Sequence, residues 1–64
     1  MTPDRDIWRA ANLLIRDHGD GAEFVAARRV DKMLERGDHE SEAIWLRIRR
    51  AVVEMQTGPI GKPN

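Results

Sequence analysis

The 64-residue sequence contains no cysteine and no tyrosine, and its only aromatic residues are one phenylalanine and two tryptophans. Without cysteine the chain forms neither disulfides nor thiolate metal sites. No apolar run approaches the roughly 18 residues of a membrane-spanning helix. Residues 1–4 lack the basic and apolar regions of a signal peptide. We therefore expect a cytoplasmic protein that has no membrane partner.

The sequence also lacks an excess of charge of either sign. Its eleven basic and eleven acidic residues give a formal net charge of zero, whereas a dedicated nucleic-acid-binding protein usually has a clear basic excess. A chain of this length forms one domain and buries only about 60% of its unfolded surface. Because neither a disulfide nor a thiolate metal site can stabilise so small a core, oligomerisation is the stabilising device that remains available.

Two Gly-Asp pairs, Gly19-Asp20 and Gly37-Asp38, divide the chain into three segments of helix length. Glycine suits the left-handed position just past a helix end, and aspartate suits the cap that starts the next helix. Each pair can therefore end one helix and begin another with almost no loop between them.

No segment alternates with period two, so we expect no strands. Very short connections fold consecutive helices back on each other. The predicted fold is all-α, a small three-helix bundle in a single domain over residues 1–64, with the first helix packed against both others. The predicted helices span residues 3–18, 21–36 and 39–56, and residues 57–64 are expected to form a flexible tail.

The helix starts carry recognisable capping residues. Thr2 can cap the first helix, with Pro3 at its first position. Asp20 and Glu23 have the spacing of a capping box for the second helix. Asp38 is the expected cap of the third helix.

Apolar residues recur at helical spacing in all three segments, most clearly in the third. We expect Leu34 on the inner face of the second helix and the two tryptophans, Trp8 and Trp45, at the core or its edge. The predicted core consists of Ile7, Ala10, Ala11, Leu14, Ala26, Val30, Met33, Ile44, Ile48, Ala51, Val52 and Met55.

Two apolar residues, Leu46 and Val53, fall on the outer side of the third helix, seven positions apart. Arg49 and Arg50 edge this stripe, and Val25 points outward on the second helix. An exposed apolar helix stripe is typical of a surface that binds another chain. These five residues form the candidate partner interface, although single exposed apolar residues are also common on ordinary surfaces.

The outer face of the second helix carries four basic residues within about 100°, namely Arg28, Arg29, Lys32 and Arg36. They form a candidate anion-binding face, which could bind nucleic acid. The simpler interpretation is a solvated helix surface on which Asp31 and Glu35 also lie.

A more specific form of the nucleic-acid hypothesis is a helix-turn-helix, with Arg47, Arg49 and Arg50 exposed on the third helix. That helix begins with acidic residues, which would face phosphates. Nucleic acid is therefore the less favoured partner.

No residue pattern indicates catalysis, a cofactor or a small-molecule substrate. Ser41 is the only serine, and no glycine-rich phosphate loop follows a strand. His18 and His39 have acidic neighbours that could complete a metal site. However, His18 suits a helix C-terminus and His39 a surface position, so no metal site is predicted.

Several short runs resemble a family of short bacterial proteins carried as a domain of unknown function. The likeness covers roughly residues 6–56 and rests on residues 7–15, His18-Gly19, residues 26–31, Gly37-Asp38, residues 45–48 and Ala51. It implies a small all-helical protein and brings no activity, cofactor or catalytic residue. Arg29 and Asp31 belong to the shared pattern.

The sequence thus supports two hypotheses. The first is a non-enzymatic interaction module that associates with itself or another chain through Leu46 and Val53. The alternative is a small nucleic-acid-binding regulator that uses the basic face of the second helix. Salt dependence separates them, because phosphate contacts weaken steeply as salt rises whereas apolar association holds or strengthens.

Overall fold

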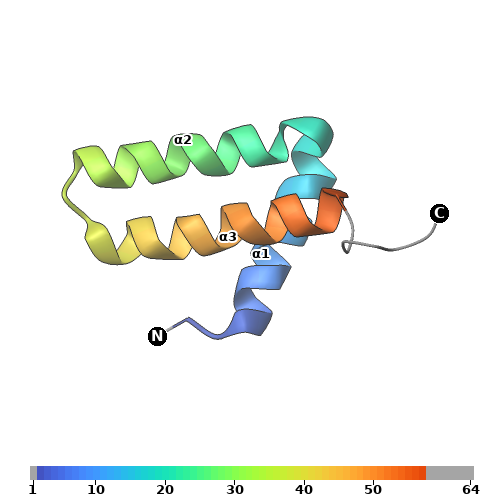
Figure 1. Cartoon of the computed structure of the whole chain (residues 1–64), viewed down its shortest axis with the longest axis horizontal. Coiled ribbons are helices and arrows are strands. Elements are labelled where there is room, and N and C mark those ends of the chain that lie inside the picture. Colours follow the sequence, from blue (N-terminus) through green and yellow to red (C-terminus); the bar gives the residue numbers. More distant parts are fainter. Residues whose placement is uncertain (1, 58–64) are drawn as a thin grey trace.

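The computed structural model describes residues 2–57, which are helical apart from short connections (Figure 1). The elements are α1 (Asp4–His18), a short 3₁₀ turn η1 (Gly19–Gly21), α2 (Ala22–Glu35) and α3 (His39–Thr57). No strand occurs within these residues, and the prediction of an all-α fold is confirmed. Of the predicted tail, Thr57 belongs to α3 and the other residues, 58–64, lie outside the described part.

Helices α2 and α3 lie side by side and antiparallel, and α1 crosses behind this hairpin (Figure 1). The contact between α2 and α3 is the most extensive in the molecule. Helix α1 contacts both of them, and α3 more than α2. The prediction that the first helix touches both others is therefore confirmed, although its crosswise direction is not visible in the sequence.

The start of α1 differs from the prediction, because Thr2 does not cap it. Pro3 is the N-cap, and there is no side-chain cap hydrogen bond at this helix start. The backbone N–H groups of Asp6 and Ile7 donate to the Pro3 carbonyl at 3.0 and 3.3 Å. The Thr2 carbonyl instead accepts a hydrogen bond from Arg47 of α3, so this residue serves the contact between helices.

The connection between α1 and α2 is partly as predicted. Gly19 ends α1 with a φ of 55°, a conformation that favours glycine. The expected capping box of Asp20 and Glu23 is wrong, because Gly21 is the N-cap of α2 and makes no side-chain cap bond. A capping residue needs extended backbone, whereas the 3₁₀ turn leads into α2 with Gly21 already at helical angles, φ −85° and ψ −1°.

The connection between α2 and α3 confirms both expected roles of its Gly-Asp pair. Gly37 has a φ of 71°, and its N–H donates to the Leu34 carbonyl at 3.0 Å. The Asp38 N–H donates to the Met33 carbonyl at 2.9 Å, which completes a Schellman motif. The Asp38 side chain then accepts the Ser41 N–H at 3.1 Å and so caps α3.

The core is small and rich in alanine. Four of its eight buried apolar residues are alanines, and Val52 is the largest fully buried side chain. The eight are Ile7, Ala11, Ala22, Ala26, Val30, Ile48, Ala51 and Val52. Partly buried residues pack against the main cluster, namely Ala10, Leu14, Ile15, Ile44, Trp45 and Met55.

Leu34 contradicts its predicted place on the inner face, since 52% of it is exposed. It lies in the last turn of α2, near the tip of the hairpin, and α1 crosses the hairpin away from that tip (Figure 1). Only two helices meet there, so no third helix covers Leu34. Conversely Ala22, which the predicted core omitted, is fully buried, and Met33 is only half-buried.

Candidate functional site

Four of the five residues predicted to form a partner interface lie together on α3. Leu46, Arg49, Arg50 and Val53 line a shallow open depression with Glu23 of α2. We call these five residues the Leu46–Val53 patch. Leu46 is 44% exposed and Val53 is half-buried, so the patch offers apolar surface between charged side chains.

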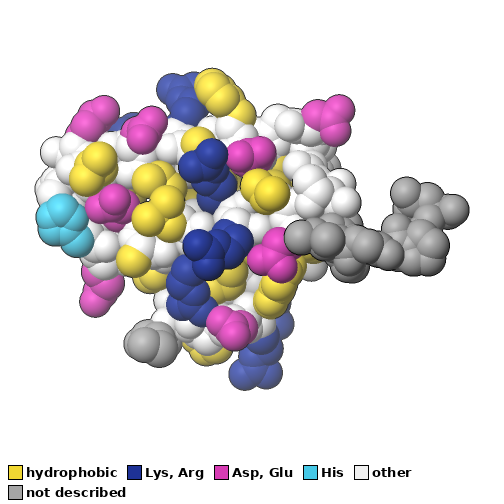
Figure 2. Space-filling model, viewed as in Figure 1, with side chains coloured by type: hydrophobic (Ala, Val, Ile, Leu, Met, Phe, Trp, Pro, Cys, Tyr) yellow, Lys and Arg dark blue, Asp and Glu magenta, His cyan; other side chains and the backbone are white. Residues whose placement is uncertain are grey.

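Helical spacing explains why the α3 residues of the patch share one surface. They stand at positions i, i+3, i+4 and i+7, which fall on one side of a helix. Buried Ile48 points to the opposite side of α3. The side of the hairpin away from α1 shows hydrophobic side chains interleaved with basic and acidic ones (Figure 2).

An ion pair joins the two helices at the patch. The Arg49 guanidinium donates to Glu23 Oε2 from Nε at 3.3 Å and from Nη2 at 3.2 Å. Arg50, which neighbours this pair, makes no ion pair with any of residues 2–57. Sequence analysis missed Glu23 here because its spacing from Asp20 pointed to a capping box.

Val25, the fifth predicted interface residue, lies elsewhere. It is two positions from Glu23, and at about 100° per residue two positions put it on the far side of α2. It lines a second depression, which we call the α2 strip. The Leu46–Val53 patch is therefore built without it.

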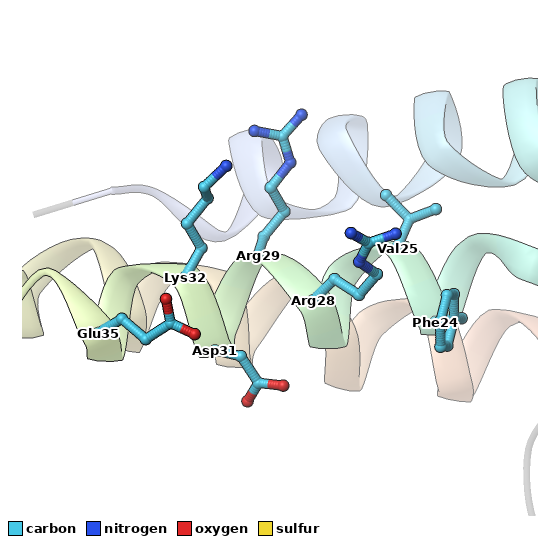
Figure 3. A pocket seen from close by; sticks show the side chains of 7 residues that line it. All are labelled: Phe24, Val25, Arg28, Arg29, Asp31, Lys32 and Glu35. Atoms are coloured by element: carbon cyan, nitrogen blue, oxygen red, sulfur yellow. The ribbon is translucent and has the colours of Figure 1, made fainter.

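The α2 strip holds three of the four predicted anion-binding residues (Figure 3). Arg29 and Lys32 point to one edge of the helix, whereas Asp31 points to the other (Figure 3). Arg36 is the C-cap residue of α2 and does not line the strip. All the lining residues come from α2 alone, so the strip is an open surface: Phe24, Val25, Arg28, Arg29, Asp31, Lys32 and Glu35.

Two arginines of the α2 strip contact aromatic rings. The Cζ atom of Arg29 lies 5.6 Å from the centre of the half-buried Trp45 ring of α3. The Cζ atom of Arg28 lies 5.9 Å from the Phe24 ring centre. Both distances are within cation–π range. Arg29 thus joins α2 to α3, a structural role that the sequence pattern did not assign to it.

Arg47, an exposed position in the helix-turn-helix hypothesis, is partly buried and bound to the start of α1. Its Nη1 donates to the Thr2 carbonyl at 2.9 Å, and its Nη2 donates to Asp4 Oδ1 at 2.5 Å. At the other end of α1, Gln56 Nε2 donates to the Gly19 carbonyl at 2.8 Å. Two side chains of α3 therefore hold α1 at both of its ends.

The Asp38 cap also sets the pKa of that carboxyl. The hydrogen bond from the Ser41 backbone N–H lowers the pKa of Asp38 below its ordinary value of 3.8, and the Ser41 hydroxyl adds to the effect. Hydrogen bonding to the charged form of this exposed carboxyl is the largest cause of the shift, and the nearby Arg36 and His39 also lower the pKa.

The histidines lie apart from any metal-like arrangement. His18 is exposed, and His39 Nδ1 lies 3.2 Å from Glu42 Oε1. Among residues 2–57 no three histidine or acidic side chains converge as metal ligands. In the same part of the chain no polar or charged residue is buried. None of the three described helices is long and apolar enough to cross a membrane.

No family model matches the chain, and no curated protein or solved structure is significantly similar to it. The resemblance to a family of short bacterial proteins stays a prediction.

Proposed function

We propose that the protein is a non-enzymatic three-helix bundle that associates with itself through the Leu46–Val53 patch. The observation that carries this proposal is the grouping of Leu46 and Val53 with three charged side chains in one open depression. Half-exposed apolar side chains ringed by charges are typical of a surface that binds another chain. The bacterial source and the cytoplasmic location remain parts of this proposal.

The composition of the core supports association. Alanines make up half of the buried apolar residues, while large apolar side chains stay at the surface: Trp8, Leu13, Phe24, Leu34 and Leu46. Burial of apolar surface stabilises by about 25 cal/mol per Å². A second chain that covers Leu46 and its neighbours would add burial that one copy of so small a domain cannot supply.

Several charged side chains already have structural roles. Asp38 caps α3, Arg49 pairs with Glu23 and Arg47 pairs with Asp4. These interactions occur at helix starts and between helices. They give the charged side chains structural roles, which need no catalytic function. This supports a binding module in preference to an enzyme.

Sedimentation equilibrium from low to high micromolar concentration, at low and high salt, tests the proposal. We expect a dimer that persists at high salt, because apolar burial does not weaken as ions screen charges. Leu46→Glu combined with Val53→Glu should give a monomer, since it places carboxylates in the contact. Leu13→Glu is the matched control, because Leu13 is 45% exposed, as much as Leu46, but lies on α1.

Two results would contradict this proposal. The wild-type chain could be monomeric over the whole concentration range, or the Leu46→Glu, Val53→Glu variant could dimerise as well as the wild type. The control variant guards against a general effect of added negative charge.

The alternative is a small nucleic-acid-binding regulator that uses the α2 strip. The observation in its favour is that Arg29 and Lys32 point to the same edge of α2 (Figure 3). It is the weaker candidate, because Arg28 and Arg29 lie over aromatic rings and two carboxylates share the strip. Binding of duplex DNA that falls steeply with salt would favour it over self-association.

A further inference from the structure

The Leu46–Val53 patch carries charges of both signs as well as apolar surface. A two-fold dimer uses the same patch on both copies, so such a patch must be complementary to itself. Arg49 already pairs with Glu23 within the chain. Arg50 has no ion-pair partner among the described residues. A second copy of the chain could supply that partner.

The Arg49–Glu23 pair fixes which residues of α2 and α3 lie at the same level of the hairpin. Its 3.2 Å contact puts residue 23 opposite residue 49. Arg50 is one residue further, about 1.5 Å along the helix. Because the helices are antiparallel, half-buried Ala27 lies near the level of Leu46, one turn closer to the hairpin tip.

Two hairpins can lie face to face about two-fold axes of two different directions. A two-fold axis that runs across the helices, at the middle of the patch, brings Arg50 against Arg50 of the second copy. Like charges in contact oppose association. An axis parallel to the helices instead lays α3 of each copy over α2 of the other. Each residue then stays at the same position along the helix direction in both copies. Arg50 then meets Glu23 of the second copy, and Leu46 meets the small Ala27 side chain.

The geometry points to a two-fold dimer of this second kind, in which two α2–α3 hairpins stack face to face as an antiparallel four-helix bundle and Arg50 pairs with Glu23 of the second copy. This inference rests on the proposed self-association and adds its partner, symmetry and pairing residues. Each Glu23 accepts from Arg49 of its own chain and from Arg50 of the other. Helix α1 lies on the opposite side of each hairpin (Figure 1) and leaves the contact open.

Charge reversal followed by mixing tests the pairing. Arg50→Glu alone and Glu23→Arg alone each create two like-charge contacts in the dimer, so we expect the dissociation constant to rise at least about tenfold. An equimolar mixture of the two variants should form a 1:1 heterodimer, because both contacts again join an arginine to a glutamate. Analytical ultracentrifugation with one variant fluorescently labelled measures this directly.

The controls separate pairing from folding. Arg28→Glu reverses a charge on the α2 strip and should leave the dimer unchanged. Glu23→Arg also loses the bond to Arg49 within the chain. If circular dichroism shows that this variant is unfolded, Glu23→Gln takes its place. Its mixture with Arg50→Glu still has one attractive contact and no repulsive one.

The outcomes distinguish this inference from the proposed function. Recovery of the heterodimer on mixing supports the pairing. If the wild type dimerises and Leu46→Glu with Val53→Glu abolishes the dimer, but mixing restores nothing, only the pairing is wrong. A dimer unaffected by Arg50→Glu also overturns the pairing. A wild-type chain that stays monomeric overturns both proposals.

Discussion

At the scale of single residues, the two aspartates that follow glycines behave differently. Asp38 accepts the Ser41 N–H and caps α3, whereas Asp20 sits within the η1 turn and caps nothing. The conformation of the surrounding backbone decides whether each aspartate caps a helix. Asp38 follows a Schellman turn that leaves it just outside α3, while the 3₁₀ turn carries Asp20 directly toward α2.

Asp38→Ala should therefore lower the melting temperature at about pH 7, while Asp20→Ala should leave it nearly unchanged. The folded-state pKa of Asp38 is below its ordinary value of 3.8, so its stabilisation is present above that value. It is lost as the pH falls through the lower folded-state pKa. Thermal melts followed by circular dichroism from about pH 7 to pH 2 should show the Asp38→Ala melting curve converging with the wild type. Equal effects of the two substitutions at neutral pH would contradict the assigned cap.

The roles of other residues could not be predicted because their partners lie far away in the sequence. Arg29 contacts Trp45, which lies on another helix. Arg47 is similar, since its partners Thr2 and Asp4 precede it by more than forty residues. Sequence spacing indicates the face of a helix on which a residue lies, but not which helix covers that face.

At the scale of elements, the glycines Gly37 and Gly21 in the two connections have different backbone conformations. Gly37 has a φ of 71°, while Gly21 has a φ of −85°. A Cβ atom added at either position would meet nothing within 4 Å. Any difference between alanine substitutions at these sites therefore reflects backbone conformation and not crowding.

Gly37→Ala should reduce the free energy of unfolding by about 1 kcal/mol, because an L-residue is strained in the left-handed region. Gly21→Ala should raise it by about 0.4–1 kcal/mol, because alanine reduces the entropy of the unfolded chain and fits the native angles. Urea denaturation at one fixed chain concentration measures both. A stabilising Gly37→Ala would show that the turn between α2 and α3 is not the Schellman motif described above.

Helix positions were predictable because their signals are local: apolar periodicity, glycine stops and one true cap. The ends of α1, α2 and α3 differ from the expected limits by no more than one residue each. The crosswise direction of α1 was not predictable. It depends on contacts that Arg47 and Gln56 make from the distant α3, and no local pattern encodes them.

At the scale of the whole molecule, α3 makes the most extensive contacts with the other helices. Ile48, Ala51 and Val52 of this helix are all buried, and α3 contacts both other helices. The predicted inner face of α3 is therefore confirmed. The surface could be predicted less well, because Glu23 lies beside Arg49 and not in a capping box, and Val25 lies apart from Leu46 and Val53.

Ile48→Ala should reduce the free energy of unfolding by about 2–5 kcal/mol, through lost burial and the cavity that remains. Ile48 is only 5% exposed. In so small a domain this loss is most of the stability. Leu13→Ala is the control, since Leu13 is 45% exposed and its truncation should change little. Chemical denaturation in which the Ile48→Ala curve overlays the wild-type curve would contradict the assigned core.

The attachment of α1 to α3 affects the order in which the helices pack during synthesis of the chain. The bonds of Arg47 to Thr2 and Asp4, and of Gln56 to Gly19, close loops of 37 to 45 residues. The α2–α3 hairpin closes through a turn of three residues, from Arg36 to Asp38. Long loops are entropically harder to close than short ones. On the ribosome α1 emerges before α2 and α3 but gains its docking site only after α3 has been synthesised, so the earliest of these three helices is the last to be packed.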